Sequence, residues 1–146
     1  MENCENNNEV EKQITLAQWQ TCVEMANAVS QRRDTTNNLF VTLHLAVIGA
    51  ITALSSFTKC ETCIVCFLGI AFCFVWMKII KNFKILNSEK YSVITELEKM
   101  LPNQPLTREW ENIQKSHYKL GTSLERILPL IFLFIYVVLM IERFFC

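Results

Sequence analysis

Three cysteines stand at three-residue intervals in the segment TKCETCIVCF, residues 58–67. The C-x-x-C spacing of Cys60 and Cys63 is typical of zinc sites and of redox-active dithiols. A structural zinc site usually takes its four ligands from two such pairs on separate segments, and this chain has no second pair. We therefore expect no metal here. Two uses remain for the thiols of this helix. Cys66 and Cys73 would be small packing residues in a helix interface, or Cys60 and Cys63 would form a disulfide, within or between subunits, in an oxidising compartment.

No other residues form a recognisable reaction centre. The chain has two histidines, His44 and His117, and neither has a nucleophile or a carboxylate at a familiar spacing. With only three glycines there is no phosphate-binding loop. The 14 basic residues balance the 14 acidic ones, which gives no reason to expect nucleic acid as a partner. The sequence predicts no catalytic site and no cofactor.

The apolar residues concentrate in three blocks, LFVTLHLAVIGAITALSSF, CIVCFLGIAFCFVWM and ILPLIFLFIYVVLMI. A helix needs about 20 mostly apolar residues to cross a bilayer, and each block reaches that length with its flanks. None carries a charge at its centre. The pattern predicts an all-α, multi-pass membrane protein with transmembrane helices over 39–57, 62–80 and 124–145. Trp76 would then lie in the aromatic belt of the membrane interface.

The distribution of basic residues predicts the orientation of these helices. Arg32 and Arg33 precede the first block, whereas the link to the second block carries only Lys59. Several lysines follow the second block: Lys78, Lys81, Lys84 and Lys90. Because basic residues are enriched on the cytoplasmic side of membranes, the N-terminus and the segment 81–123 should be cytoplasmic.

The polar segments read as helices that extend from the membrane. Residues 1–8 look disordered, but 9–38 form an apolar stripe at helical spacing that runs into the first transmembrane helix. Residues 81–123 continue the second transmembrane helix, turn at the prolines Pro102 and Pro105, and restart with Thr107 as a potential N-cap. Trp110 would be the buried anchor of this hook. Amphipathic extensions of this kind favour homo-oligomerisation through a cytoplasmic collar.

One face of the first apolar helix is polar. His44, Thr52 and Ser55 fall near this face, and they could line a pore or hold a protonatable group. The alternative is structural, because His, Ser and Thr also join membrane helices through hydrogen bonds. Both interpretations stay open at this stage.

Two segments resemble a known family. A polar helix that ends in S-x-R-R precedes the first membrane helix, and WMKIIKNFKILNSEKYSVITELEKMLPNQPLTREWE follows the second. This pattern resembles the RipA family of bacterial octameric membrane proteins and is similar to the small membrane modules called SLATT. The likeness runs from Trp19 to Glu111. The matched positions are Arg32, Arg33, Asn38, Trp76, Leu86, Asn87, Lys90, Leu97, Glu98, Leu101, Pro102, Glu109 and Trp110.

The resemblance implies a multi-pass protein of the bacterial cytoplasmic membrane that forms a ring of about eight subunits without enzymatic activity. It implies structural roles in the collar: Asn87 and Lys90 would tie the extension to a neighbour, Glu98 would belong to the same structure, and Pro102 would fix the hook that holds Trp110. His44 departs from the family, where an Asn is expected.

Three functional hypotheses follow. The first is an oligomeric assembly in membrane lipid that encloses a pore. The second is a membrane-anchored scaffold that recruits a cytosolic protein. The third is a defence effector that breaches the membrane only when triggered.

Overall fold

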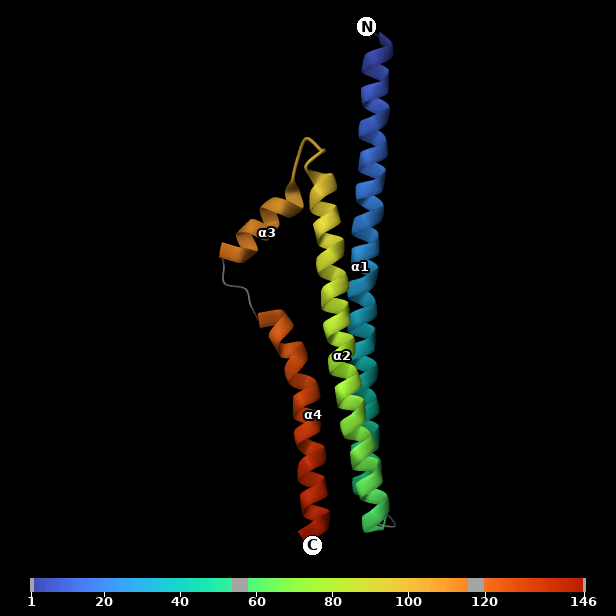
Figure 1. The fold of residues 1–146 in the computed structure, drawn as a ribbon, viewed down its shortest axis with the longest axis vertical. Helices are drawn as coiled ribbons and strands as arrows, with labels where there is room; N and C mark the ends of the chain where they lie inside the picture. The colour runs from blue at the N-terminus through green and yellow to red at the C-terminus, as the bar shows by residue number, and fades with distance from the viewer. Residues whose placement is uncertain (1, 54–57, 116–119, 146) are drawn as a thin grey trace. The chain divides into compact units, whose positions relative to one another are not determined.

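The computed structural model describes residues 2–53, 58–115 and 120–145, without the side chains of 2–8, 114–115, 120–124 and 144. The described residues form four helices (Figure 1): α1 Glu2–Ala53, α2 Lys59–Glu98, α3 Pro105–Lys115 and α4 Leu120–Phe145. No strand occurs within those ranges. The predicted all-α class is confirmed.

Helices α1 and α2 run without a break from their apolar blocks into their polar extensions. The 40 residues of α2 correspond to a rod of about 60 Å at 1.5 Å per residue. Neither helix contains a proline, and their glycines are isolated, so nothing in the sequence interrupts the backbone hydrogen bonds. The structure extends α1 back to Glu2, through part of the stretch for which disorder was expected.

The chain divides into two compact units, which we name by their surfaces. The apolar unit comprises Arg33–Asn82 and Lys119–Cys146, and the polar unit comprises Met1–Arg32 and Phe83–Tyr118. These boundaries lie within a few residues of the predicted membrane boundaries at 38/39, 80/81 and 123/124.

The core of the apolar unit lies among α1, α2 and α4. Its buried residues are Ile51, Cys66, Cys73, Trp76, Ile80, Phe132 and Tyr136. On α2 the buried positions follow one another at steps of three and four: Thr62, Cys66, Gly69, Cys73, Trp76 and Ile80. On α4 they are Pro129, Phe132 and Tyr136. This is the heptad spacing of helices that pack side by side with knobs in holes.

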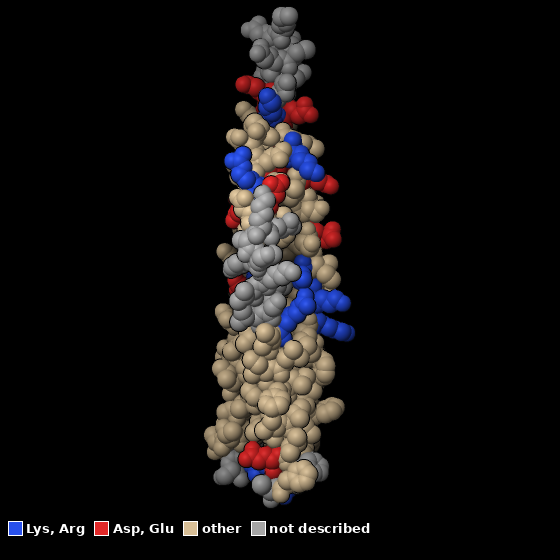
Figure 2. Space-filling view, turned by 90° about the vertical axis from the view of Figure 1, so that its left-hand side faces the viewer, with Lys and Arg blue, Asp and Glu red and all other residues tan. Residues whose placement is uncertain are grey.

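The outer surface of the apolar unit is hydrophobic. Large exposed side chains include Phe67, Leu68, Phe72, Phe74 and Phe134. In Figure 2 a long stretch of the visible surface carries neither blue nor red side chains. Exposed apolar surface on this scale indicates contact with lipid or with other protein chains.

Among the residues that the structure describes, two helical stretches are long and apolar enough to cross a membrane, Glu9–Ala53 and Lys59–Glu98. They contain residues 39–53 of the first predicted transmembrane segment and all of the second, 62–80; residues 54–57 of the first lie outside the described residues.

In the polar unit a tight turn follows α2. The N–H of Met100 donates to the carbonyl of Leu97, and the N–H of Leu101 donates to that of Glu98. Pro105 is then the first residue of α3, a position where the missing N–H costs nothing. The prediction of Thr107 as N-cap is therefore wrong, because Thr107 lies inside the first turn.

Candidate functional site

A histidine lies buried in the core of the apolar unit: His44 of α1 is 1 % exposed. Its Nδ1 lies 2.9 Å from the hydroxyl of Tyr136 on α4, and its Nε2 lies 3.8 Å from Sγ of Cys73 on α2. Tyr136 and Cys73 are fully buried. One imidazole thus joins all three helices of the unit.

The three polar groups satisfy one another without a charge. A neutral imidazole has one N–H donor and one acceptor nitrogen, while a hydroxyl and a thiol can each take either role. Either tautomer of His44 therefore pairs with both neighbours, the contact to sulfur being the weaker. No ring nitrogen is left to exchange protons with a water-filled space, and the arrangement favours helix packing.

Aromatic rings surround this polar group. The ring of Phe40 stacks on Trp76 with centroids 5.4 Å apart and planes inclined by 6°, and the ring of His44 stacks on Phe132 at 4.9 Å. The indole Nε1–H of Trp76 donates to Oδ1 of Asn37 at 2.9 Å. Trp76 is fully buried. It lies on the packed face of α2 between Cys73 and Ile80, so its ring does not face outward from the unit; its predicted depth at the membrane interface stays a prediction.

Gly69 makes room for the Tyr136 ring. A Cβ built at Gly69 would lie 2.6 Å from Cε1 and 2.7 Å from Cε2 of that ring, closer than real side chains approach. The same test at Gly49 finds nothing within 4 Å. Gly69 is thus required by the close approach of α4, whereas Gly49 is not.

The predicted polar face of α1 does not form a group. His44 is buried, but Thr52 is exposed, and its hydroxyl donates to the carbonyls of Ile48 and Gly49 in its own helix. Ser55 lies outside the described residues. The partners of His44, by contrast, come from α2 and α4, which a single-helix pattern cannot reveal. The sequence did contain a pattern that places Tyr136 on the packed face of α4, because it falls at heptad spacing from Pro129 and Phe132.

The segment with the three cysteines forms the first turns of α2. Thr58 and Glu61 make a capping box: the N–H of Glu61 donates to Oγ1 of Thr58 at 3.3 Å, and the N–H of Thr58 donates to the Glu61 carboxylate at 2.9 Å. These bonds hold the pKa of Glu61 below its usual range. Cys60 and Cys63 both carry free thiols in this single chain. No cluster of His, Cys, Asp or Glu suited to a metal occurs in the part of the chain that the structure describes.

In the polar unit, Glu98 holds the start of α3. Its carboxylate accepts the N–H of Leu106 at 2.8 Å, and the N–H and hydroxyl of Thr107 at 2.9 and 2.6 Å. Burial acts to raise the pKa of Glu98, but these three hydrogen bonds outweigh it, and the net pKa lies below the usual range. A side chain from the end of α2 thus supplies the acceptor that a helix normally obtains from its own N-cap.

The other predicted collar residues are placed differently. Asn87 has its Oδ1 buried with no partner among the described residues, and Lys90 is half-buried. Trp110 is 61 % exposed, so in one chain it is not the buried anchor of the hook. Its side of α3 is not covered, whereas Leu106 and Thr107 are held by Glu98.

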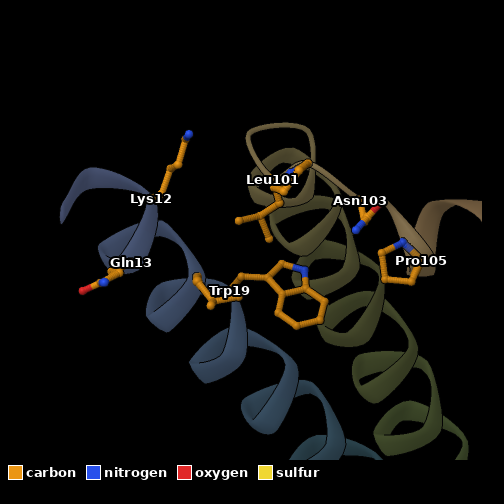
Figure 3. A pocket seen from close by; sticks show the side chains of 8 residues that line it. Lys12, Gln13, Trp19, Leu101, Asn103 and Pro105 are labelled. Atoms are coloured by element: carbon orange, nitrogen blue, oxygen red, sulfur yellow. The ribbon is translucent and has the colours of Figure 1, made fainter. Parts of the chain in front are cut away.

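Pro102 borders a pocket of about 370 Å³ in the polar unit. Trp19 of α1 reaches toward the turn that carries Leu101 and Pro105 (Figure 3), and its Nε1 is buried without a hydrogen-bond partner in the described part of the chain. Trp19 thus takes the place in the turn that was predicted for Trp110.

These long helices have a hydrophobic outer surface, and the polar side chains buried around His44 form hydrogen bonds with one another. This combination is typical of a helical membrane protein. The sequence profile of the octameric membrane protein family (8xMP) matches residues 16–145. The chain belongs to this family, which supports an oligomeric membrane assembly. A search of curated proteins and a search of solved structures each returned no match.

Proposed function

We propose that the chain is one subunit of a homo-octamer in the bacterial cytoplasmic membrane, which presents its polar unit to the cytoplasm as a scaffold and conducts no ions at rest. The observation that carries this proposal is the buried pairing of His44 with Tyr136 and Cys73. A subunit whose polar membrane groups pair internally offers its neighbours apolar surface, which is a poor lining for an aqueous pore. No catalytic activity is part of the proposal.

The topology that supports this function has three spans. Helix α4 has 26 residues, about 39 Å in length, which exceeds a hydrocarbon core of about 30 Å. Its charged residues stand near its ends: Glu125, Arg126, Glu142 and Arg143. Between them the helix is uncharged, and its packing against Gly69 and His44 keeps it beside the two other apolar helices. The basic residues next to the polar extensions favour a cytoplasmic N-terminus.

The scaffold role follows from the polar unit. Trp110 and Met100 are 61 % and 69 % exposed, and large exposed side chains of this kind are typical anchors of protein interfaces. The resemblance to the RipA family supports a ring in which these side chains meet a neighbouring subunit or a cytosolic protein.

The test is the membrane potential of bacteria that express the full chain, read with a voltage-sensitive dye, with His44→Ala in a parallel strain. The scaffold predicts a full potential for the wild type at high, correctly inserted expression. Rapid depolarisation by the wild type would contradict a resting closed assembly and would favour the pore or the membrane-breaching effector.

A second experiment addresses the scaffold directly. The full chain is purified from the membrane with its bound proteins, beside the double variant Met100→Ser, Trp110→Ser. The proposal expects one cytosolic protein in fixed ratio to the wild type and its loss from the variant. An assembly that stays octameric and carries no such protein in either form would contradict it.

A further inference from the structure

Helix α2 carries a row of exposed lysines directly after its apolar stretch. Lys78, Lys81 and Lys84 are exposed and follow one another at three-residue steps, which places them near one side of the helix. We call them the lysine row. No Asp or Glu occurs on α2 between Glu61 and Glu89, so the helix itself offers them no counter-charge.

The acidic groups near this end of the apolar unit are already paired. Arg33 approaches Asp34 at 3.6 Å and Glu125 at 3.4 Å, and its side chain is only 26 % exposed. Lys78 and Lys81 have no ion pair within the described residues. In Figure 2 blue side chains gather where the uncharged stretch of surface ends.

The two ends of the apolar unit differ in charge. At the end near the lysine row the described residues include more basic than acidic side chains. The basic ones are Arg33, Lys78, Lys81 and Arg126, and the acidic ones are Asp34 and Glu125. At the other end Lys59 and Arg143 stand against Glu61 and Glu142. Only the first end therefore carries an excess of positive charge.

We propose that the lysine row binds the phosphate groups of anionic phospholipids at the cytoplasmic face of the membrane. A lysine can lay its alkyl stem along apolar surface and place its ammonium group among the lipid headgroups. Val75 and Phe74, just before the row, are about half exposed and would contact the acyl chains of the same lipids. A free phosphate ion would find no such apolar contact, which favours lipid as the source of the phosphate.

This inference rests on the membrane crossing of α2 but not on the scaffold function. Each lysine near an anionic membrane contributes about a fivefold preference, so the three together are expected to give a large selectivity for anionic over zwitterionic lipid.

The experiment uses the full chain in phosphatidylcholine vesicles that contain spin-labelled phosphatidylglycerol or spin-labelled phosphatidylcholine. Electron paramagnetic resonance measures the fraction of each label that the protein immobilises. We expect the wild type to prefer phosphatidylglycerol at least fivefold. The triple variant K78Q/K81Q/K84Q should lose most of this preference, and K78R/K81R/K84R should keep it. The matched control K12Q/K99Q/R108Q removes the same charge from exposed positions of the polar unit and should behave as the wild type.

Three outcomes would overturn the proposal: no preference in the wild type, a preference that survives K78Q/K81Q/K84Q, or an equal loss in the control. The lipid preference is also measured in potassium phosphate and in potassium chloride at equal ionic strength. If phosphate displaces the labelled phosphatidylglycerol from the protein more strongly than chloride does, the lysine row binds free phosphate instead. If the triple Gln variant fails to insert, K81Q alone should still lower the preference about fivefold. The voltage-dye and co-purification experiments fail or succeed independently of this one.

Discussion

The hydroxyl of Tyr136 lies 2.9 Å from Nδ1 of His44, and this hydrogen bond joins residues that are 92 positions apart in the sequence. It is the buried side-chain bond that ties α4 to α1. Because both side chains are buried, neither has water as an alternative partner. The bond therefore specifies which face of α4 meets the other two helices.

Replacing Tyr136 by Phe should destabilise the protein by about 1 kcal/mol, since hydrogen bonds between membrane helices contribute from about 0.6 to 1.7 kcal/mol. The ring would remain and only the hydroxyl would be lost. Thermal unfolding of the octamer in detergent measures the change. Tyr91→Phe is the control, because Tyr91 is 44 % exposed and should tolerate the loss of its hydroxyl. Equal melting temperatures for Tyr136→Phe and Tyr91→Phe would show that the buried bond does not stabilise the fold.

Gly69→Ala should be strongly destabilising, because the added methyl group meets the Tyr136 ring. Overpacking of this kind typically costs about 1–3 kcal/mol. Gly49→Ala adds the same methyl group where nothing lies within 4 Å, and the better helix propensity of Ala should make it neutral or slightly stabilising.

The two glycine variants are compared by the detergent concentration or temperature at which the octamer dissociates. The second-site change Tyr136→Ala should relieve the effect of Gly69→Ala in part. Similar behaviour of both glycine variants would contradict the close approach of α4 to α2.

Glu98→Gln should loosen the start of α3. An amide accepts these hydrogen bonds less well than a carboxylate does, and hydrogen bonds to a charged group contribute about 1.5–3 kcal/mol. The expected result is faster proteolysis or faster hydrogen exchange within Pro105–Lys115. Glu96→Gln on the exposed side of the same turn is the control and should leave exchange unchanged.

The contribution of Glu98 should also depend on pH. The folded pKa lies below the usual range, so the stabilisation is present above the unfolded pKa of about 4.3 and is lost as pH falls through the folded value. The difference in melting temperature between wild type and Glu98→Gln should therefore be constant near neutral pH and shrink below about pH 4. If the difference in melting temperature grew as the pH was lowered, the Glu98 carboxylate would not be the source of the stabilisation.

Cys60 offers a test of orientation. It is exposed at the start of α2, on the side opposite to the predicted cytoplasmic extensions. A membrane-impermeant maleimide added to intact cells should label Cys60 in a variant that retains this cysteine alone. A variant that retains only Cys22 should be labelled after the cells are opened. Labelling of Cys22 in intact cells would reverse the proposed topology.

The sequence predicted the helices well because their signals are local. Long apolar runs and the scarcity of Gly and Pro determine where α1, α2 and α4 can form, whatever they contact.

The pairing of side chains could not be predicted in the same way. His44 was found as an unusual residue, but its partners depend on which faces of three helices meet. The heptad spacing of Cys66, Gly69 and Cys73 contained that information for α2. Trp110 shows the same limit: it was expected to be buried in the hook, and in one chain it is exposed.

The link between His44 and Tyr136 also concerns the order of synthesis. A ribosome adds about 5–20 residues per second, so the 92 positions between them take roughly 5 to 18 seconds to translate. In the proposed topology His44 reaches the bilayer before Tyr136 exists, so α1 and α2 wait there with Nδ1 of the imidazole unpaired. Arrival of α4 completes the pairing. In this topology the arrival of α4 therefore decides when a newly inserted subunit is ready to join its copies.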